Sequence, residues 1–189
     1  MDEVLDRKLR EMVDRQEIFQ LLLRYARGLD RMDRALIRDC YWDDAIDDHH
    51  GFIGDPDSFI DWAFEYNIAV SEVQHHGLSN HYCEIDGDNA SSETYYTFIG
   101  GNIEPPHLLS IGRYIDHFQR RDGVWKMANR VTVIEKNYEL PEHAADAMIR
   151  AGDTSQGPLL PATRDRSDLS YHRPVMPRRP ASEKGRQDG

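Results

Sequence analysis

The chain has little cysteine and no long apolar run. Its 189 residues include two cysteines, Cys40 and Cys83, which form neither a CxxC pair nor a regular framework. Such sparse cysteine excludes a disulfide-stapled fold and is typical of a reducing compartment. No apolar run approaches the roughly 20 residues of a membrane span, and the N-terminal sequence lacks the apolar core of a signal peptide. We therefore expect a soluble cytoplasmic protein with no membrane partner.

Basic residues and cofactor motifs are also scarce. The chain has 23 lysines and arginines against 34 aspartates and glutamates, which gives a net charge of −11. A body with this charge repels phosphate backbones and anionic lipids, so we expect no nucleic-acid partner. There is no GxGxxG, P-loop or GxSxG motif, so neither a nucleotide cofactor nor a serine nucleophile is supported.

Proline divides the chain near Tyr138. Of the nine prolines, only three precede this residue. We expect residues 1–138 to form the folded domain. For residues 139–189 the composition predicts a short helix at 141–152 and then a Pro- and Arg-rich arm that is extended or disordered.

Hydrophobic periodicity predicts three N-terminal helices. Apolar residues recur at threes and fours from about residue 2 to Asp30, and the segment 31–42 is typical of a second, short helix. A third helix is expected to begin at a cap formed by Asp55 or Asp57 and to run to about residue 70.

A period of two follows the helices and predicts strands. Two strands flank an Asp-Gly-Asp turn at 86–88, and two more flank the turn at 121–123. A short strand is expected at 43–53. Three helices followed by a meander of strands predict an α+β fold, in which one curved antiparallel sheet carries the helices on one face.

His-His-Gly occurs twice, and the copy at 75–77 is a candidate general base. Neighbouring residues on a strand face opposite ways, so only one of His75 and His76 can enter a given cavity. Histidine titrates near neutrality, which suits proton abstraction. Asn80 lies four residues after His76, so on a regular strand it shares the same face and could orient either His76 or a substrate.

The copy at 49–51 has a different context. Asp47 and His49 share one strand face, and Asp48 and His50 share the other. This composition resembles a metal-ligand set, but no HxH or HxxxH spacing supplies a third ligand. A solvated strand end with paired charges is the favoured interpretation, and a histidine at the mouth of a pocket is the alternative.

Two further positions are candidates for charge stabilisation. Tyr25 and Asp30 lie roughly 140° apart around a helix, so Asp30 either caps the next helix or dips with Tyr25 into a cavity. Arg130 lies an odd number of residues from Trp125, which places it on the opposite face of a regular strand. An inward arginine would stabilise an anionic intermediate or leaving group.

Aromatic side chains near these groups suit a cavity for an apolar or aromatic ligand. Among them, Trp42 and Tyr96 are candidate substrate contacts, together with His50 and Asn80. The full set comprises Tyr41, Trp42, Phe52, Phe59, Trp62, Phe64, Tyr66, Tyr95, Tyr96 and Phe98.

Three stretches taken together resemble the SnoaL-like branch of the nuclear-transport-factor-2-like superfamily. The combination is specific: a Tyr-x4-Asp at the end of the first helix, YWDDA, a histidine four residues before an asparagine, and RRDGVWK followed by an arginine. The likeness covers about 14–134. The resemblance implies a cone formed by a curved antiparallel sheet and three helices, and a homo-oligomer, with a trimer favoured over a dimer.

The resemblance also implies lyase chemistry without a metal or organic cofactor. The family contains dehydratases, a dehydrochlorinase and a diarylpropane lyase, which act on small hydrophobic molecules inside the cone. Its Asp–His dyad falls on Asp30 and His76, its dehydratase tyrosine on Tyr25 and its dehydrochlorinase arginine on Arg130. The family places this histidine on the cavity side. The DDHHG stretch at 47–51 is not a family hallmark.

We therefore predict dehydration or carbon–carbon cleavage of a hydroxylated, aromatic, hydrophobic substrate, with His76 as the base. Two rival functions remain. The same fold supports non-catalytic ligand-binding or assembly modules, which would bind without turnover. A metal-dependent enzyme built on residues 47–50 is the second rival.

Overall fold

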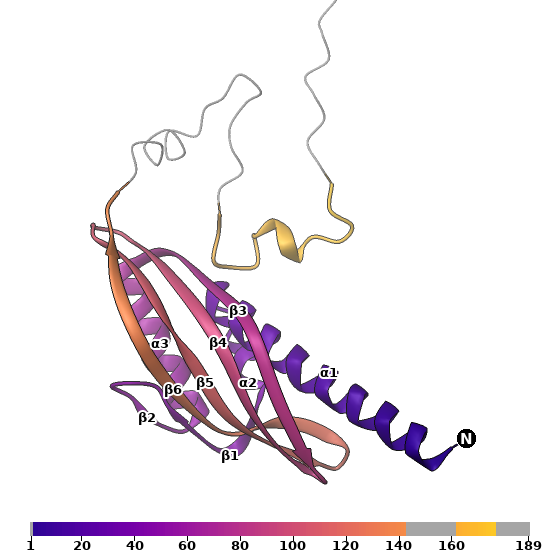
Figure 1. Cartoon of the computed structure of the whole chain (residues 1–189). Coiled ribbons are helices and arrows are strands. Elements are labelled where there is room, and N and C mark those ends of the chain that lie inside the picture. The colour runs from indigo at the N-terminus through magenta and orange to yellow at the C-terminus, as the bar shows by residue number, and fades with distance from the viewer. Residues whose placement is uncertain (1, 143–161, 177–189) are drawn as a thin grey trace, which may run out of the picture.

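Three helices lie on one face of a sheet in the computed structural model, which describes residues 2–142 and 162–176 (Figure 1). They are α1 (Glu3–Asp30), α2 (Arg34–Arg38) and α3 (Pro56–Val70). Aspartates begin all three: the side chains of Asp2, Asp33 and Asp55 each accept a hydrogen bond from the first turn. The second helix is shorter than the pattern predicts, because residues 41 and 42 already belong to a strand.

The sheet has six strands in the order β2-β1-β6-β5-β4-β3, and it is mixed rather than wholly antiparallel. The four long strands form antiparallel hairpins, as predicted. However, β1 pairs with β6 in parallel, a contact between distant segments that local periodicity could not indicate. The strands are β1 (Tyr41–Asp48), β2 (Ile53–Gly54), β3 (Ser71–Asp86), β4 (Asn89–Asn102), β5 (His107–Arg121) and β6 (Val124–Leu140).

Only the C-terminal half of α1 packs into the core. Leu5, Leu9 and Met12 follow the helical period but are exposed, since the first turns of α1 project past the sheet (Figure 1). Asp14 marks the point where packing begins. Its carboxylate accepts from the Trp125 indole at 2.9 Å and from the Arg120 guanidinium at 2.8 Å, which anchors α1 to the β5–β6 hairpin.

Two β-bulges reverse the direction of side chains within a strand. On β3, Ser79 pairs with Tyr95 and His81 with Thr94, so Asn80 is an extra residue without a cross-strand partner. Asn80 is exposed, and the prediction that it shares the face of His76 is wrong, because the bulge interrupts the alternation.

The second bulge corrects the prediction for Arg130. On β6, Met127 pairs with Phe118 and Asn129 with His117, so Ala128 is the extra residue. Trp125 and Arg130 are both buried, at 2% and 1% exposure, on the inner side of the sheet. A regular strand would have placed them on opposite faces.

Part of the C-terminal arm packs against the C-terminal end of α1 and the start of α2. Residues 162–176 contain a 3-10 turn, η1 (Leu169–Tyr171), and the Tyr171 hydroxyl donates to Asp33 at 2.9 Å. The guanidinium of Arg27 lies 4.7 Å from the centre of the Tyr171 ring. Most of the predicted helix at 141–152 falls outside the described residues. Within the described residues, no helix has the length and apolar character that a membrane crossing needs.

Candidate functional site

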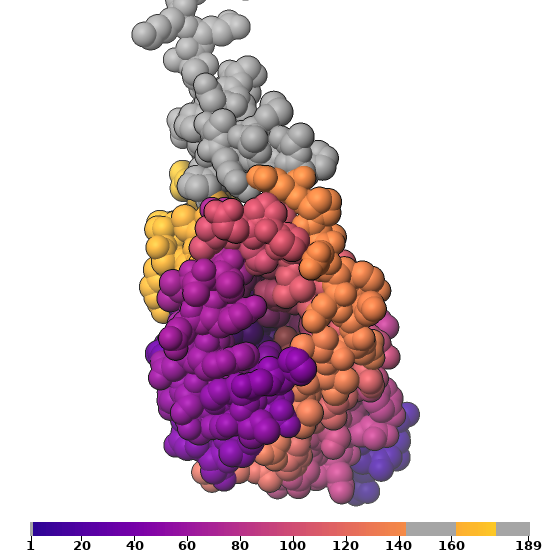
Figure 2. All heavy atoms as spheres, turned by 90° about the vertical axis from the view of Figure 1, so that its left-hand side faces the viewer, coloured from indigo at the N-terminus to yellow at the C-terminus, as the bar shows by residue number. Residues whose placement is uncertain are grey.

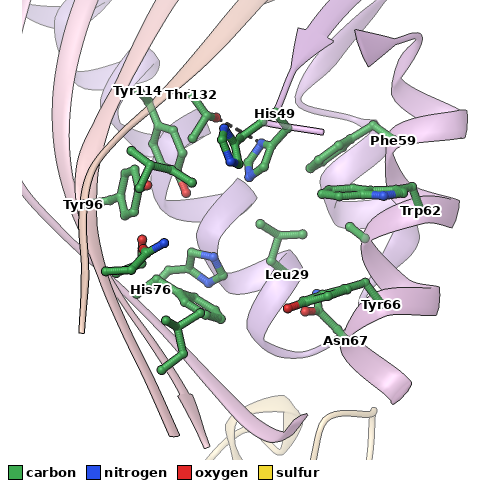
Figure 3. Close-up of a pocket in the computed structure, with 17 residues that line it drawn as sticks. Leu29, His49, Phe59, Trp62, Tyr66, Asn67, His76, Tyr96, Tyr114 and Thr132 are labelled. Atoms are coloured by element: carbon green, nitrogen blue, oxygen red, sulfur yellow. Dashed lines mark hydrogen bonds between the residues drawn. The ribbon is translucent and has the colours of Figure 1, made fainter. Parts of the chain in front are cut away.

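A cavity of about 320 Å³ lies between the sheet and α3. Figure 2 shows the surface hollowed between α3 and β6, where this cavity opens. Aromatic rings from α3 face the inner side of the sheet across it (Figure 3). Its volume is within the range of sites for small organic ligands. The lining residues are Leu29, His49, His50, Phe59, Trp62, Ala63, Tyr66, Asn67, His76, Tyr96, Phe98, Leu108, Ser110, Tyr114, Thr132, Ile134 and Asn137.

His76 and Asp30 form a hydrogen-bonded pair at the cavity wall. Asp30 Oδ1 lies 2.6 Å from His76 Nδ1, and the two Asp30 oxygens also accept from the His76 backbone N–H at 3.2 and 3.1 Å. The ring of His76 packs on Phe98 with 4.8 Å between centroids. Because Asp30 accepts the proton on Nδ1, Nε2 is the nitrogen available to a ligand.

The end of α1 places Asp30 at this position. Asp30 is the last helical residue, and the chain turns sharply at Met32, which has a positive φ of 50°. Gly28 permits the close return of α2, because a Cβ there would lie 2.5 Å from Ile37 Cγ1. The helix stays regular to Asp30.

A second histidine–carboxylate pair enters the same cavity from β1. Asp47 is fully buried, and its Oδ1 lies 3.2 Å from Nδ1 of His49. The Tyr41 hydroxyl donates to Asp47 Oδ2 at 2.5 Å, and Thr132 Oγ1 is 3.0 Å from His49 Nδ1. Asp47 and His49 are therefore not part of a solvated strand end, although His50 beside them is exposed. The alternative prediction, a histidine lining a pocket, is confirmed.

Asp47 and His49 do not complete a metal site. In the part of the chain that the structure describes, no three His, Cys, Asp or Glu side chains gather as metal ligands would.

Arg130 and Tyr25 lie in a buried polar cluster with Asp116 and Tyr114, behind the cavity wall. Arg130 donates to both oxygens of Asp116, at 2.7 and 2.8 Å. Its guanidinium lies between the rings of Tyr25 and Tyr114, 4.1 and 4.0 Å from their centres. Of these four residues only Tyr114 lines the cavity. The structure thus brings Arg130 and Tyr25 into contact with each other, but neither side chain lines the cavity.

Charge within this cluster is fixed by burial and pairing. Burial raises the pKa of Tyr25 well above its ordinary value, although Arg130 acts in the opposite direction, so the phenol stays protonated. Burial opposes the charge on Arg130, but the Asp116 carboxylate outweighs it and keeps the pKa of the guanidinium well above its ordinary value. Burial also raises the pKa of Asp116, although Arg130 acts in the opposite direction. The two short contacts between the side chains are those of a bidentate ion pair.

The model of the SnoaL-like domain family matches residues 10–131. The chain belongs to the SnoaL-like family. A search of curated protein sequences finds no match to this SnoaL-like protein.

Solved structures share the fold of this SnoaL-like protein. A hexachlorocyclohexane dehydrochlorinase from Novosphingobium barchaimii is 21% identical with a TM-score of 0.67, and the match covers 72% of this chain and 96% of that one. A protein from Novosphingobium aromaticivorans assigned as a scytalone dehydratase is 17% identical with a TM-score of 0.63, covering 71% and 92%. Similarity at this level establishes the fold, and enzymes occur among these neighbours.

The four predicted substrate contacts of the SnoaL-like protein separate into two pairs. His50 and Tyr96 line the cavity. Asn80 is exposed at its bulge, and Trp42 lies outside the lining. The Trp42 indole on β1 instead donates to the backbone carbonyl of Gln119 on β5 at 3.0 Å. Neither Trp42 nor Asn80 is among the residues that would contact a ligand there.

The sequence did not reveal four polar side chains that line this cavity. Ser110, Thr132 and Asn137 come from β5 and β6, and Asn67 comes from α3. Periodicity could have placed Thr132 on the inner face only if the bulge at residue 128 had been known. Asn67 stands eight residues after Phe59, a helical spacing that puts both on one face of α3.

The free energy of unfolding of the SnoaL-like protein should depend on pH through His81. Burial lowers its pKa from the ordinary value of 6.5, although Asp116 acts in the opposite direction. The unfolded chain therefore binds this proton at higher pH than the folded protein does. The free energy of unfolding should fall as pH drops below about 6.5, until the folded pKa is passed.

We expect His81→Gln to show a shallower loss of stability than the wild type between about pH 7 and pH 5. Urea unfolding midpoints at the two pH values measure this. The other histidines are common to both proteins, so the difference isolates His81. Parallel losses in the two proteins would show that burial of His81 has no such effect.

Proposed function

We propose that this protein is a cofactor-independent lyase in which Asp30 and His76 form the general base. The observation that supports this is the 2.6 Å contact between Asp30 and Nδ1 of a histidine whose ring lines the cavity. A carboxylate at Nδ1 fixes the tautomer and orients the ring, and it stabilises the imidazolium that forms when a proton is taken.

The cavity walls favour a small aromatic substrate that carries hydroxyl groups. Phe59, Trp62 and Tyr66 of α3 provide aromatic faces on one side, and Tyr96 provides one on the other (Figure 3). Phe98, on the same strand as Tyr96, also lines the cavity. Hydrogen-bonding groups are interspersed among these rings. They are contributed by Asn67, Ser110, Tyr114, Thr132 and Asn137.

Neutral phenols would support the developing charge in this reaction. Burial raises the pKa of Tyr114 and of Tyr96, so both hydroxyls remain hydrogen-bond donors at neutral pH. Arg130 and Tyr25 would act indirectly, because the guanidinium and its bidentate partner Asp116 hold the strands that carry Tyr114 and Thr132. This differs from direct contact with the leaving group.

Two related reactions suit this site. Removal of a proton from a carbon beside a carbonyl would drive loss of a β-hydroxyl. Removal of a hydroxyl proton would drive cleavage of the adjacent carbon–carbon bond, with release of formaldehyde from a diarylpropane diol as one version. The dehydrochlorinase and the protein assigned as a dehydratase support elimination as the general class.

Turnover of two probes tests the proposal. One is the β-hydroxy ketone that loses water to give chalcone, and the other is a diarylpropane diol that would give a stilbene, formaldehyde and water. The purified full-length protein, dialysed against a metal chelator, should form chalcone or formaldehyde faster than buffer alone. Binding of both probes without any product would contradict the proposal and indicate a ligand-binding module.

A further inference from the structure

The cavity contains a second imidazole whose support matches that of His76. Asp47 contacts Nδ1 of His49 at 3.2 Å, as Asp30 contacts Nδ1 of His76. Nε2 of His49 is therefore free for a ligand. Figure 3 shows the two rings in one cavity, with His49 arriving from the end of β1 and His76 from β3.

The fold holds His49 firmly. Its backbone N–H donates to the Phe52 carbonyl at 2.8 Å across a tight turn, in which His50 and Gly51 both have positive φ. Its ring lies against Phe59, with 5.0 Å between centroids. A side chain held by its backbone, its carboxylate partner and a ring contact is oriented before the substrate arrives.

The carboxylate behind His49 is costly to place there. Asp47 has 0% exposure, so its charge is removed from water and needs compensation. Tyr41 satisfies one oxygen, while the other is directed at His49. The nearest cation on the neighbouring strand, Arg130, is paired with Asp116. The carboxylate contact at Nδ1 therefore leaves Nε2 as the nitrogen through which His49, a residue of the cavity lining, can give a proton to a ligand.

We propose that His49 is the general acid of this active site and that the leaving group is an oxygen that must be protonated, not a halide. This inference rests on the proposed function. A second base would be redundant beside His76, whereas elimination of a hydroxyl requires one proton to be taken and one to be given, and two imidazoles in one cavity can divide these tasks.

The step balances with these two histidines alone. His76 Nε2 takes the proton from carbon, the C–H electron pair forms the new C=C bond, the C–O bond breaks, and its oxygen leaves as water with the proton of His49. In the diol, His76 takes the hydroxyl proton, formaldehyde leaves, the C–C pair forms the C=C bond, and the second hydroxyl leaves as water. Proton exchange with solvent restores both imidazoles.

A change of leaving group provides the test. The β-chloro counterpart of the hydroxy ketone also gives chalcone, but chloride departs without a proton. We expect His49→Gln to slow chalcone formation from the hydroxy ketone by about 100-fold and from the chloro ketone by less than about 3-fold, after subtraction of the buffer rate. Retained chloride loss shows that the variant is folded. Asp47→Asn should show the same selectivity, weakened, because it removes the carboxylate behind the acid.

Each other outcome has a distinct meaning. Equal rates for wild type and His49→Gln with both ketones would overturn the assignment of His49, as would an equal loss with both, which would indicate a structural role. If chalcone formation survives His76→Gln, the proposed function fails instead, and a His49-selective effect would still identify the acid. If the wild type acts on neither ketone nor on the diol, both proposals fall.

Discussion

His76→Gln is expected to lower chalcone formation by at least about 100-fold with either ketone, because the variant has no group at this position that can take a proton. Glutamine keeps the polarity and much of the volume of histidine, so the fold should persist. Initial rates at saturating ketone measure the effect, and the far-ultraviolet circular dichroism spectrum checks the fold.

Asp30→Asn should cause a loss of similar order. The amide can still accept hydrogen bonds from the backbone N–H of His76, but it cannot stabilise the imidazolium that forms during proton transfer. Its effect should therefore appear mainly in kcat, with less change in KM, because the shape of the cavity is retained.

His75→Gln is the matched control for these two variants. His75 neighbours His76 on β3 but is exposed and does not line the cavity. Its replacement should leave turnover within about 3-fold of wild type. If His75→Gln were as damaging as His76→Gln, or if Asp30→Asn were fully active, the Asp30–His76 base would be the wrong assignment.

Arg130→Met is expected to cost about 3–5 kcal/mol in the free energy of unfolding. The arginine is the only bidentate partner that the described residues give to Asp116, and both side chains have 0% exposure. Its removal leaves Asp116 buried without compensation, while the charge of a second buried carboxylate, Asp47 on the other side of β6, acts on it unfavourably. Chemical unfolding at neutral pH measures the loss.

Two further variants make this result specific. Arg113→Met also removes a cation that binds two carboxylates, Glu93 and Glu135, but these groups are partly exposed, so the loss should be much smaller. The double variant Arg130→Met, Asp116→Leu should recover part of the stability, because no unpaired charge remains. If Arg130→Met and Arg113→Met cost the same, burial of the pair is not what matters.

The elements of this fold were largely predictable because they depend on local patterns. Three helices, the cap of the third and two hairpins follow from periodicity and turn residues, whereas the cap of α2 is Asp33 and not Asp30. The functional site was harder to predict from the sequence than the fold. Local periodicity favours a solvated strand end at residues 47–50 and offers only His50 there as a substrate contact, because the parallel pairing of β1 with β6 that buries Asp47 joins segments far apart in the chain.

Two side chains were assigned to the wrong face of the sheet because a single extra residue interrupts each strand. Counting by twos along a strand gave the wrong face for Asn80 and for Arg130, because each count crossed a bulge, at residues 80 and 128. Neither bulge contains a glycine or other residue that marks it in the sequence. The assignment of the base to His76 and Asp30 came from the family resemblance rather than from spacing.

The bulge on β3 also has a consequence for how this protein can change. It divides the inner face of the strand into a ligand-facing stretch with His76 and a core stretch with His81 and Cys83, and each keeps its own alternation. Substitutions in the ligand-facing stretch therefore need not change the packing of side chains in the core stretch. This chain can therefore acquire new ligand contacts by mutation near His76 while the packing around Cys83 stays unchanged.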